Sequence, residues 1–305
     1  MRIGLNGGAG SIEKMVEQAR RAEADGFYAL WYPSAAAGDP VTPMAVCGRE
    51  TTSIELGTSV LQTYTSHPAL QFNRVAAAAF TMGRPGFTLG VGPSHAPAIE
   101  GRFGMSYDTV GRNTEEYVAI LAALLHGEAV DVAGAEFTLR GVQPQPMTQP
   151  VQLLVAALGP RLLRVAGSIA DGTILWMGNA RAIESHVAPR IAKAAADAGR
   201  PAPRIVAGLP VAVHDDVSEA RAVAARQFEA YGQLPNYQRI LAHGDAAGPG
   251  DAAVVGDEAS VAAQLQDLLD AGATDIWAAI FPVGDDGGAS RRRTRALLKE
   301  LVATA

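Results

Sequence analysis

The chain has 305 residues, of which 48% are hydrophobic, and its formal net charge is -6. That length can bury a sizeable core, and we expect one domain over residues 1–305. The modest negative charge and the scattered arginines argue against a nucleic-acid partner, and no apolar run approaches the roughly 20 residues of a membrane span.

The opening run Met1-Arg2-Ile3-Gly4-Leu5-Asn6 becomes polar too soon for a signal peptide. Cys47 is the only cysteine, which excludes a disulfide within the chain. Since a reducing compartment suits such a chain, we expect a cytoplasmic location and an inert, packed thiol.

Short apolar or β-branched runs alternate with longer helical patterns along the whole chain. The predicted strands are 2–6, 28–32, 54–61, 87–91, 151–156, 173–176, 205–214 and 275–281. Helical patterns between them include 11–24, 67–82, 107–126 and 218–230. This alternation predicts parallel strands joined by crossover helices. Eight such strands favour a closed (β/α)₈ barrel, with an open doubly wound sheet as the alternative.

A weak internal repeat supports the barrel. Three times a helix ends at a glycine and the following strand closes with a tryptophan, at Trp31, Trp176 and Trp277. Because the carboxyl ends of barrel strands face the active site, three rings at this position could wall a site for a planar ligand. The alternative is that they fill the barrel interior.

Two segments interrupt the alternation, after the fourth and the seventh strand–helix units. Residues 128–150 contain the run 130–139, which predicts a small hairpin. Residues 232–256 are rich in glycine, alanine and proline. We expect connecting loops, and the length of the second segment also suits a substrate lid.

The best candidate for an anion site is the turn Leu158-Gly159-Pro160-Arg161. A strand ends, a glycine turns, and a proline opens a helix at the position that tolerates it best. The free N–H groups and the helix dipole suit a phosphate, and Arg161 adds a full charge. An ordinary strand–helix turn is the alternative.

A second candidate follows the fourth strand, where the chain reads Gly90-Val91-Gly92-Pro93-Ser94-His95. The glycines let the backbone approach a flat ligand closely, and Ser94 and His95 project where catalytic groups of barrels gather. The run lacks the last glycine of a hydrolase nucleophile elbow, which argues against a hydrolase. The sequence has no metal-ligand spacing, so we expect no metal.

Several segments keep the order of one known family over essentially the whole chain. They are 54–60, 64–69, 87–92, 156–161, 170–172 and the pattern Ser94-His95-x-Pro97-x-x-Glu100-Gly101-x-x-Gly104-x-Ser106-Tyr107. Together they resemble the luciferase-like family of flavin-dependent barrels. The last pattern is similar to a signature of an actinobacterial subgroup that uses the deazaflavin coenzyme F420.

The resemblance implies roles for individual residues. It implies a cis peptide at Ser59–Val60, whose bulge backs the deazaflavin ring, with Pro93 and Ser94 beside the ring. Gly159, Pro160 and Arg161 would lie beneath the phosphate. The remaining expected cofactor contacts are Ser34, Gln62, Gly92, Leu158, Trp176 and Met177. The resemblance also implies a homodimer formed through helices near the second and third strands.

The departures from the family limit what can be transferred. Sugar-phosphate dehydrogenases of this family carry Asp-His after the second strand, where this chain has Pro33-Ser34. They place a catalytic glutamate where this chain has His95. Their sugar chemistry is therefore not expected here. A neutral imidazole at His95, with Ser94 beside it, could exchange a proton near neutral pH as a hydride moves.

We predict an F420-dependent oxidoreductase that transfers a hydride between the deazaflavin C5 and a C=C, C=N or C=O group of a small substrate. Trp31, Trp176, Tyr64 and Met177 are expected on the apolar side of the site. Two alternatives stay open: an FMN-dependent monooxygenase on the same barrel, and a non-catalytic relative that binds a flavin or deazaflavin.

Overall fold

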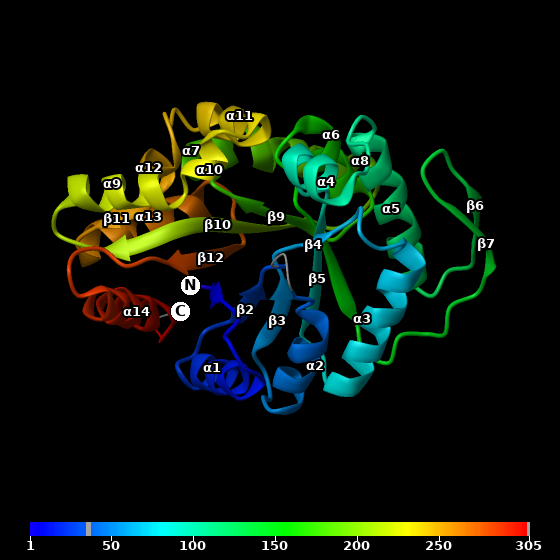
Figure 1. The fold of residues 1–305 in the computed structure, drawn as a ribbon, viewed down its shortest axis with the longest axis horizontal. Helices are drawn as coiled ribbons and strands as arrows, with labels where there is room; N and C mark the ends of the chain where they lie inside the picture. The colour runs from blue at the N-terminus through cyan, green and yellow to red at the C-terminus, as the bar shows by residue number, and fades with distance from the viewer. Residues whose placement is uncertain (35–37, 304–305) are drawn as a thin grey trace.

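The computed structural model describes residues 1–34 and 38–303 (Figure 1). Within them, eight parallel strands close into a barrel, and each has a hydrogen-bonded neighbour on both sides. Around the barrel they are β1 (Ile3–Asn6), β2 (Ala29–Tyr32), β3 (Glu55–Thr58), β5 (Phe87–Gly92), β8 (Val151–Val155), β9 (Gly172–Trp176), β10 (Arg204–Val213) and β12 (Asp275–Ile280). The prediction of a closed barrel rather than an open sheet is confirmed, since β12 pairs with β1 and β9 pairs with β10.

Two short strands extend this barrel. β4 (Leu61–Gln62) continues the third strand and pairs with the end of β5. β11 (Val254–Gly256) pairs with the end of β10. Both lie on the side of the barrel where the strands finish.

Helices surround the strands and supply the crossovers. They are α1 (Ile12–Ala24), α2 (Val41–Arg49), α3 (Pro68–Met82), α4 (Ala96–Phe103), α5 (Val110–Leu125), α6 (Pro160–Ser168), α7 (Ala180–Ala182), the π-helix η1 (Ile183–Val187), α8 (Ala188–Asp197), α9 (Val217–Gln227), α10 (Glu229–Gly232), α11 (Pro235–His243), α12 (Pro249–Ala252), α13 (Glu258–Asp270) and α14 (Gly287–Ala303). In Figure 1, α4, α6 and α11 lie together at the top of the view.

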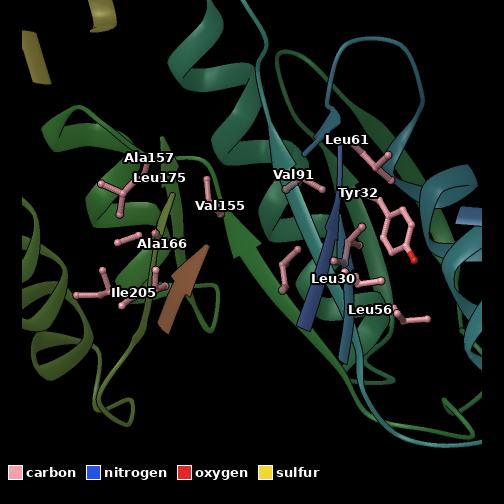
Figure 2. Close-up of a cluster of buried hydrophobic side chains, with 14 of the residues drawn as sticks. Leu30, Tyr32, Leu56, Leu61, Val91, Val155, Ala157, Ala166, Leu175 and Ile205 are labelled. Carbon is pink, nitrogen blue, oxygen red and sulfur yellow. The ribbon is translucent and has the colours of Figure 1, made fainter. Parts of the chain in front are cut away.

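Strand side chains alternate between two cores, as the period of two requires. Leu30, Leu56 and Val155 point outward into the core under the helices, part of which Figure 2 shows. Ala29 and Trp31 of the same strand β2 belong to a separate inner cluster. Cys47 is buried in the outer core, and burial raises the pKa of its thiol, as expected for an inert side chain.

The tryptophans divide between the two proposed roles. Trp31 and Trp277 fill the barrel interior and are 1% and 9% exposed. Gly57 and Gly208 make room for them, because a Cβ at either position would lie 2.3 Å from the neighbouring indole ring. The expectation that Trp31 lines the site was therefore wrong, whereas Trp176 is partly exposed at the end of β9.

Ion pairs fill the amino-terminal end of the barrel. The Arg204 guanidinium, at the start of β10, lies 2.9 Å from an Asp275 carboxylate oxygen and 2.8 Å from a Glu55 carboxylate oxygen. Arg2 reaches the same Asp275 carboxylate at 2.9 Å. Each buried carboxylate at this end thus has a cationic partner, which its burial requires.

The two insertions differ from each other. Residues 128–150 contain the predicted hairpin, formed by the antiparallel strands β6 (Val130–Ala133) and β7 (Thr138–Val142), which stands beside α5 (Figure 1). Residues 232–256 were expected to be a loop, and that was wrong, because they contain α11, α12 and β11. Pro235 opens α11, and apolar residues at 237, 240 and 241 give it a buried face that its polar neighbours obscure in the sequence.

No helix within the described residues is both long and apolar enough to cross a bilayer.

Candidate active site

The predicted site residues gather at the carboxyl ends of five neighbouring strands. Ser34 follows β2. Ser59 and Val60 follow β3, and Gln62 lies in β4, which continues it. The segment from Gly92 to His95 joins β5 to α4, the segment from Leu158 to Arg161 joins β8 to α6, and Trp176 and Met177 lie at the end of β9. Most of them are partly exposed, while Gly92 and Met177 are buried. The fold therefore brings together segments that are far apart in the sequence.

Strands β3 and β5 pack closely together and form one wall of the candidate site. The Ser59–Val60 peptide is cis, as the resemblance implied. Beside it, the Thr58 hydroxyl donates to the Gly90 carbonyl at 2.7 Å. A Cβ at Gly92 would lie 2.8 Å from the Ala156 Cβ and 3.0 Å from a Val60 methyl. Glycine at position 92 therefore lets β5 approach β8 beneath the exposed edge of Val60.

The turn after β5 places Ser94 in a left-handed backbone conformation, while His95 after it is extended. Ser94 has a φ of 61°, and the Tyr107 hydroxyl donates a hydrogen bond of 2.7 Å to its carbonyl. Tyr107 in turn stacks on Tyr64, with the ring centroids 5.5 Å apart. Left-handed residues other than glycine persist where the surroundings hold them, and they cluster at functional sites.

His95 has a buried ring nitrogen, Nδ1, without a hydrogen-bond partner among the described residues. Burial lowers the pKa of the imidazole below its ordinary value of 6.5, which favours the neutral form. A neutral imidazole can both accept and donate a proton. The geometry is compatible with the proton-transfer role predicted from the sequence.

The turn before α6 has the features predicted for an anion site. Gly159 stands at the N-cap, Pro160 opens the helix, and no side chain caps it, which leaves the first N–H groups of the helix available. Arg161 points elsewhere: it forms a 2.8 Å ion pair with Glu115, which also pairs with Arg164 at 2.8 Å. These two arginines hold the pKa of Glu115 below its usual value, although its burial opposes them. No local pattern in the sequence predicts this competing carboxylate.

An aromatic cluster surrounds Trp176 at the end of β9. The Trp176 ring lies 5.0 Å from Trp277, 5.7 Å from Phe228 and 5.9 Å from Tyr231. Tyr231 meets Tyr237 at 4.9 Å, and Tyr237 meets His95 at 5.6 Å. The Trp176 indole nitrogen is buried without a partner.

Sequence reasoning did not assign Phe228, Tyr231 or Tyr237 to the site. Phe228 directly follows α9, Tyr231 lies in α10 and Tyr237 lies in α11. Phe228 fell in the predicted helix 218–230, and Tyr237 fell in the segment 232–256, which was expected to be a loop or a lid. The signal was present in their spacing, since positions 228, 231, 234 and 237 are apolar or aromatic every third residue. Such spacing places side chains on one side of a helical segment.

Metal binding has no support in the described part of the chain. Within residues 1–34 and 38–303, no group of three or more His, Cys, Asp or Glu side chains is arranged to hold a metal ion.

Comparison with known proteins identifies the family. Residues 1–286 match the model of the luciferase-like monooxygenase family. The chain belongs to this family. An uncharacterised relative from Mycobacterium tuberculosis is 26% identical over 315 residues, covering 96% of this chain and 91% of the relative. The F420-dependent glucose-6-phosphate dehydrogenase of Beutenbergia cavernae is 33% identical over 192 residues, covering 60% of this chain and 55% of that enzyme.

Solved structures of the family share the fold with this member. The F420-dependent tetrahydromethanopterin reductase from Methanopyrus kandleri superposes with a TM-score of 0.75 at 18% identity, covering 99% of this chain and 98% of that one. A type II Baeyer–Villiger monooxygenase from a Pseudomonas putida plasmid, solved with FMN, gives 0.73 at 16% identity and covers 100% and 98%. At these identities the likeness concerns the barrel alone.

Proposed function

We propose that this luciferase-like protein is an F420-dependent oxidoreductase. It would transfer a hydride between C5 of the deazaflavin and a C=C, C=N or C=O group of a small organic substrate. Relatives named as F420-dependent support the cofactor. The proposal also takes the chain as one domain over residues 1–305 that acts as a homodimer in the cytoplasm.

The observation that carries the proposal is a set of unpartnered polar atoms. Ser59 Oγ, His95 Nδ1 and the Trp176 indole nitrogen are all buried without a hydrogen-bond partner among residues 1–34 and 38–303, and each stands at the carboxyl end of a barrel strand. Leaving such an atom unpaired costs about 1–3 kcal/mol, so a group of them calls for an explanation. A bound ligand with a polar edge would supply the partners.

Other residues at the same end of the barrel fit a flat ring that carries a phosphate arm. Val60, with Gly92 packed against it, offers an apolar surface for the back of the ring. The other proposed contacts of the ring are Ser34, Ser59, Gln62, Pro93 and Met177. The uncapped start of α6 at Gly159 and Pro160 would hold the phosphate, with Leu158 beside it. When bound, F420 supplies two-electron hydride chemistry at C5.

The protein's own contribution would be positioning, exclusion of water and proton transfer. Trp176 and the rings beside it would cover one face of the substrate. His95, neutral and with a free nitrogen, would give or take the proton that accompanies the hydride, with the Ser94 hydroxyl beside it.

One observation favours a second candidate. A structural neighbour of this fold was solved with FMN and is a monooxygenase. Anaerobic turnover separates the two functions, because a monooxygenase needs oxygen and a deazaflavin reductase does not. Reduced F420 is mixed with the protein and a panel of enones, imines and ketones without oxygen. Reoxidation of the deazaflavin by at least one of them is the expected result. No anaerobic turnover, together with oxygen-dependent turnover of reduced FMN, would establish the second candidate instead.

A further inference from the structure

One continuous set of rings joins three parts of the chain at the site. His95 comes from the turn after β5 and Trp176 from the end of β9. Phe228, Tyr231 and Tyr237 come from the run of short helices that begins at the end of α9 and includes α10 and α11. Neighbouring members lie 4.9 to 5.9 Å apart between ring centroids. We call these five residues the aromatic face.

The aromatic face is accessible at its front and supported at its back. His95, Trp176, Phe228 and Tyr231 are partly exposed, whereas Tyr237 is 8% exposed. Trp277 and Phe281 pack behind Trp176 and Phe228 and are buried. Rings held from behind and open in front form a rigid surface with little side-chain entropy left to lose on binding.

The aromatic face carries no charge at neutral pH. Burial lowers the pKa of His95 and raises the pKa of the Tyr231 and Tyr237 hydroxyls, so the imidazole and both phenols stay neutral. Arg161 of the predicted phosphate turn is already paired with Glu115. A carboxylate or phosphate placed on the aromatic face would lose water without gaining a counter-charge from any of the five side chains of that face, which is unfavourable.

Polar contacts are nevertheless possible at two places. The Trp176 indole N–H can donate one hydrogen bond, and His95 Nδ1 is also free. Both atoms are buried, so they suit one or two neutral polar groups of a ligand and cannot compensate an ionic one.

We infer that the substrate is an uncharged molecule with a flat, apolar body that lies on the aromatic face and directs a neutral polar group toward Trp176 or His95. This inference rests on the proposed function, whose substrate class it narrows. It excludes phosphorylated sugars and free carboxylic acids as good substrates.

A pair of probes of nearly the same shape tests the inference. Methyl 4-acetylbenzoate and 4-acetylbenzoate share the aromatic ketone and differ mainly in charge. Calorimetric titration of the purified chain, with and without F420, is expected to show the ester binding at least about 10-fold more tightly than the carboxylate. Equal affinity, tighter binding of the carboxylate, or no binding of the ester would overturn the inference.

A charge introduced into the face sharpens this test. Tyr231→Arg should raise the affinity for 4-acetylbenzoate about 10-fold or more and lower that for the ester, since a cation on the partly exposed front of the face now meets the anion. Tyr231→Phe is the matched control and should keep the preference of the unmodified protein. If Tyr231→Arg fails to fold by circular dichroism, Phe228→Lys replaces it. An unchanged preference in a folded cationic variant would contradict the assignment of this face to the substrate.

The titration also separates this inference from the proposed function. The charge preference is measured without F420 as well as with it, and F420 binding is recorded in its own titration. A protein that prefers the ester but does not bind F420 contradicts only the cofactor, and a protein that binds F420 but prefers the carboxylate contradicts only the substrate class.

Discussion

The two ends of this barrel differ in how their buried polar groups are paired. At the amino-terminal end, Arg204, Asp275 and Glu55 are buried and joined by ion pairs of 2.8 and 2.9 Å. At the carboxyl end, Ser59, His95 and Trp176 hold buried polar atoms that have no partner. The backbone differs in the same way, since Ser94 and Met177 at the carboxyl end have φ of 61° and 66°. The ionic groups at the amino-terminal end are paired within the chain, whereas these polar atoms at the carboxyl end lack partners among the described residues, as the proposed ligand site predicts.

The largest expected effect is a loss of stability when a buried ion pair at the amino-terminal end of the barrel is removed. Asp275→Ala removes the partner of Arg204 and Arg2 and leaves a buried guanidinium short of charge. It should lower the free energy of unfolding in urea by about 3–5 kcal/mol. The exposed pair Arg140–Asp131 provides the control, and Asp131→Ala should change stability by less than about 1 kcal/mol. Equal losses in the two variants would mean that burial at this end adds nothing.

The next effect concerns the open end. His95→Ala should slow single-turnover hydride transfer by about 100-fold, the lower range for a lost general acid or base. The variant loses the packing of the imidazole against Tyr237 but no hydrogen bond of Nδ1, so the rate is compared at a temperature where both proteins are folded. Stopped-flow absorbance of the deazaflavin measures the rate, and an unchanged rate would remove His95 from the chemistry.

The pH dependence of stability gives an independent check on His95. Burial lowers its pKa in the folded chain, so below pH 6.5 the unfolded chain takes up a proton that the folded chain refuses. Stability should therefore fall as the pH drops from 6.5 toward the lower folded pKa. Urea titrations at several pH values should show a shallower fall in His95→Ala, and identical slopes would refute a neutral, buried imidazole.

A smaller effect is expected when the turn at Ser94, at the carboxyl end of the barrel, loses a supporting hydrogen bond. Tyr107→Phe removes the hydrogen bond to the Ser94 carbonyl but keeps the ring stacked on Tyr64. The loss of about 1 kcal/mol of support should weaken cofactor binding roughly 5-fold. Tyr28→Phe, at the other end of the barrel, should leave cofactor affinity unchanged. A Tyr107 variant with full affinity would show that the turn holds its conformation without this bond.

The smallest effect concerns the phosphate turn. Glu115→Gln removes the charge that pairs with Arg161 and Arg164. Because exposed ion pairs are weak, cofactor affinity should rise only about 2- to 3-fold, and added salt should reduce the gain. Asp131→Asn in the hairpin serves as the surface control. Weaker binding in Glu115→Gln would instead mean that Glu115 holds Arg161 in its useful position.

The sequence predicted the fold well because barrel strands carry a local signal. All eight predicted strands are present, and the glycine before each tryptophan strand correctly marked a repeated unit. The local pattern does not predict whether a tryptophan at the end of a strand fills the barrel interior or lines the candidate site. Trp31 and Trp277 are core because Gly57 and Gly208 leave them space, and these glycines lie on other strands.

The site was predicted in part for the same reason. Ser94, His95 and the Gly159 turn were recognisable from turn chemistry at strand ends. Glu115 and Tyr237 reach their positions only through packing between distant elements, since Glu115 meets Arg161 across 46 positions of the chain. Contacts of that range depend on how helices settle on the barrel, which a single sequence does not encode in any short window.

The most direct test of the account is a competition between the two cofactors. The apoprotein is titrated with F420 and with FMN under the same conditions, and bound ligand is followed by fluorescence and calorimetry. F420 should bind at least about 10-fold more tightly than FMN, and Ser59→Ala should weaken F420 binding. Tighter binding of FMN, or full F420 affinity in Ser59→Ala, would contradict the assignment of this end of the barrel to the deazaflavin.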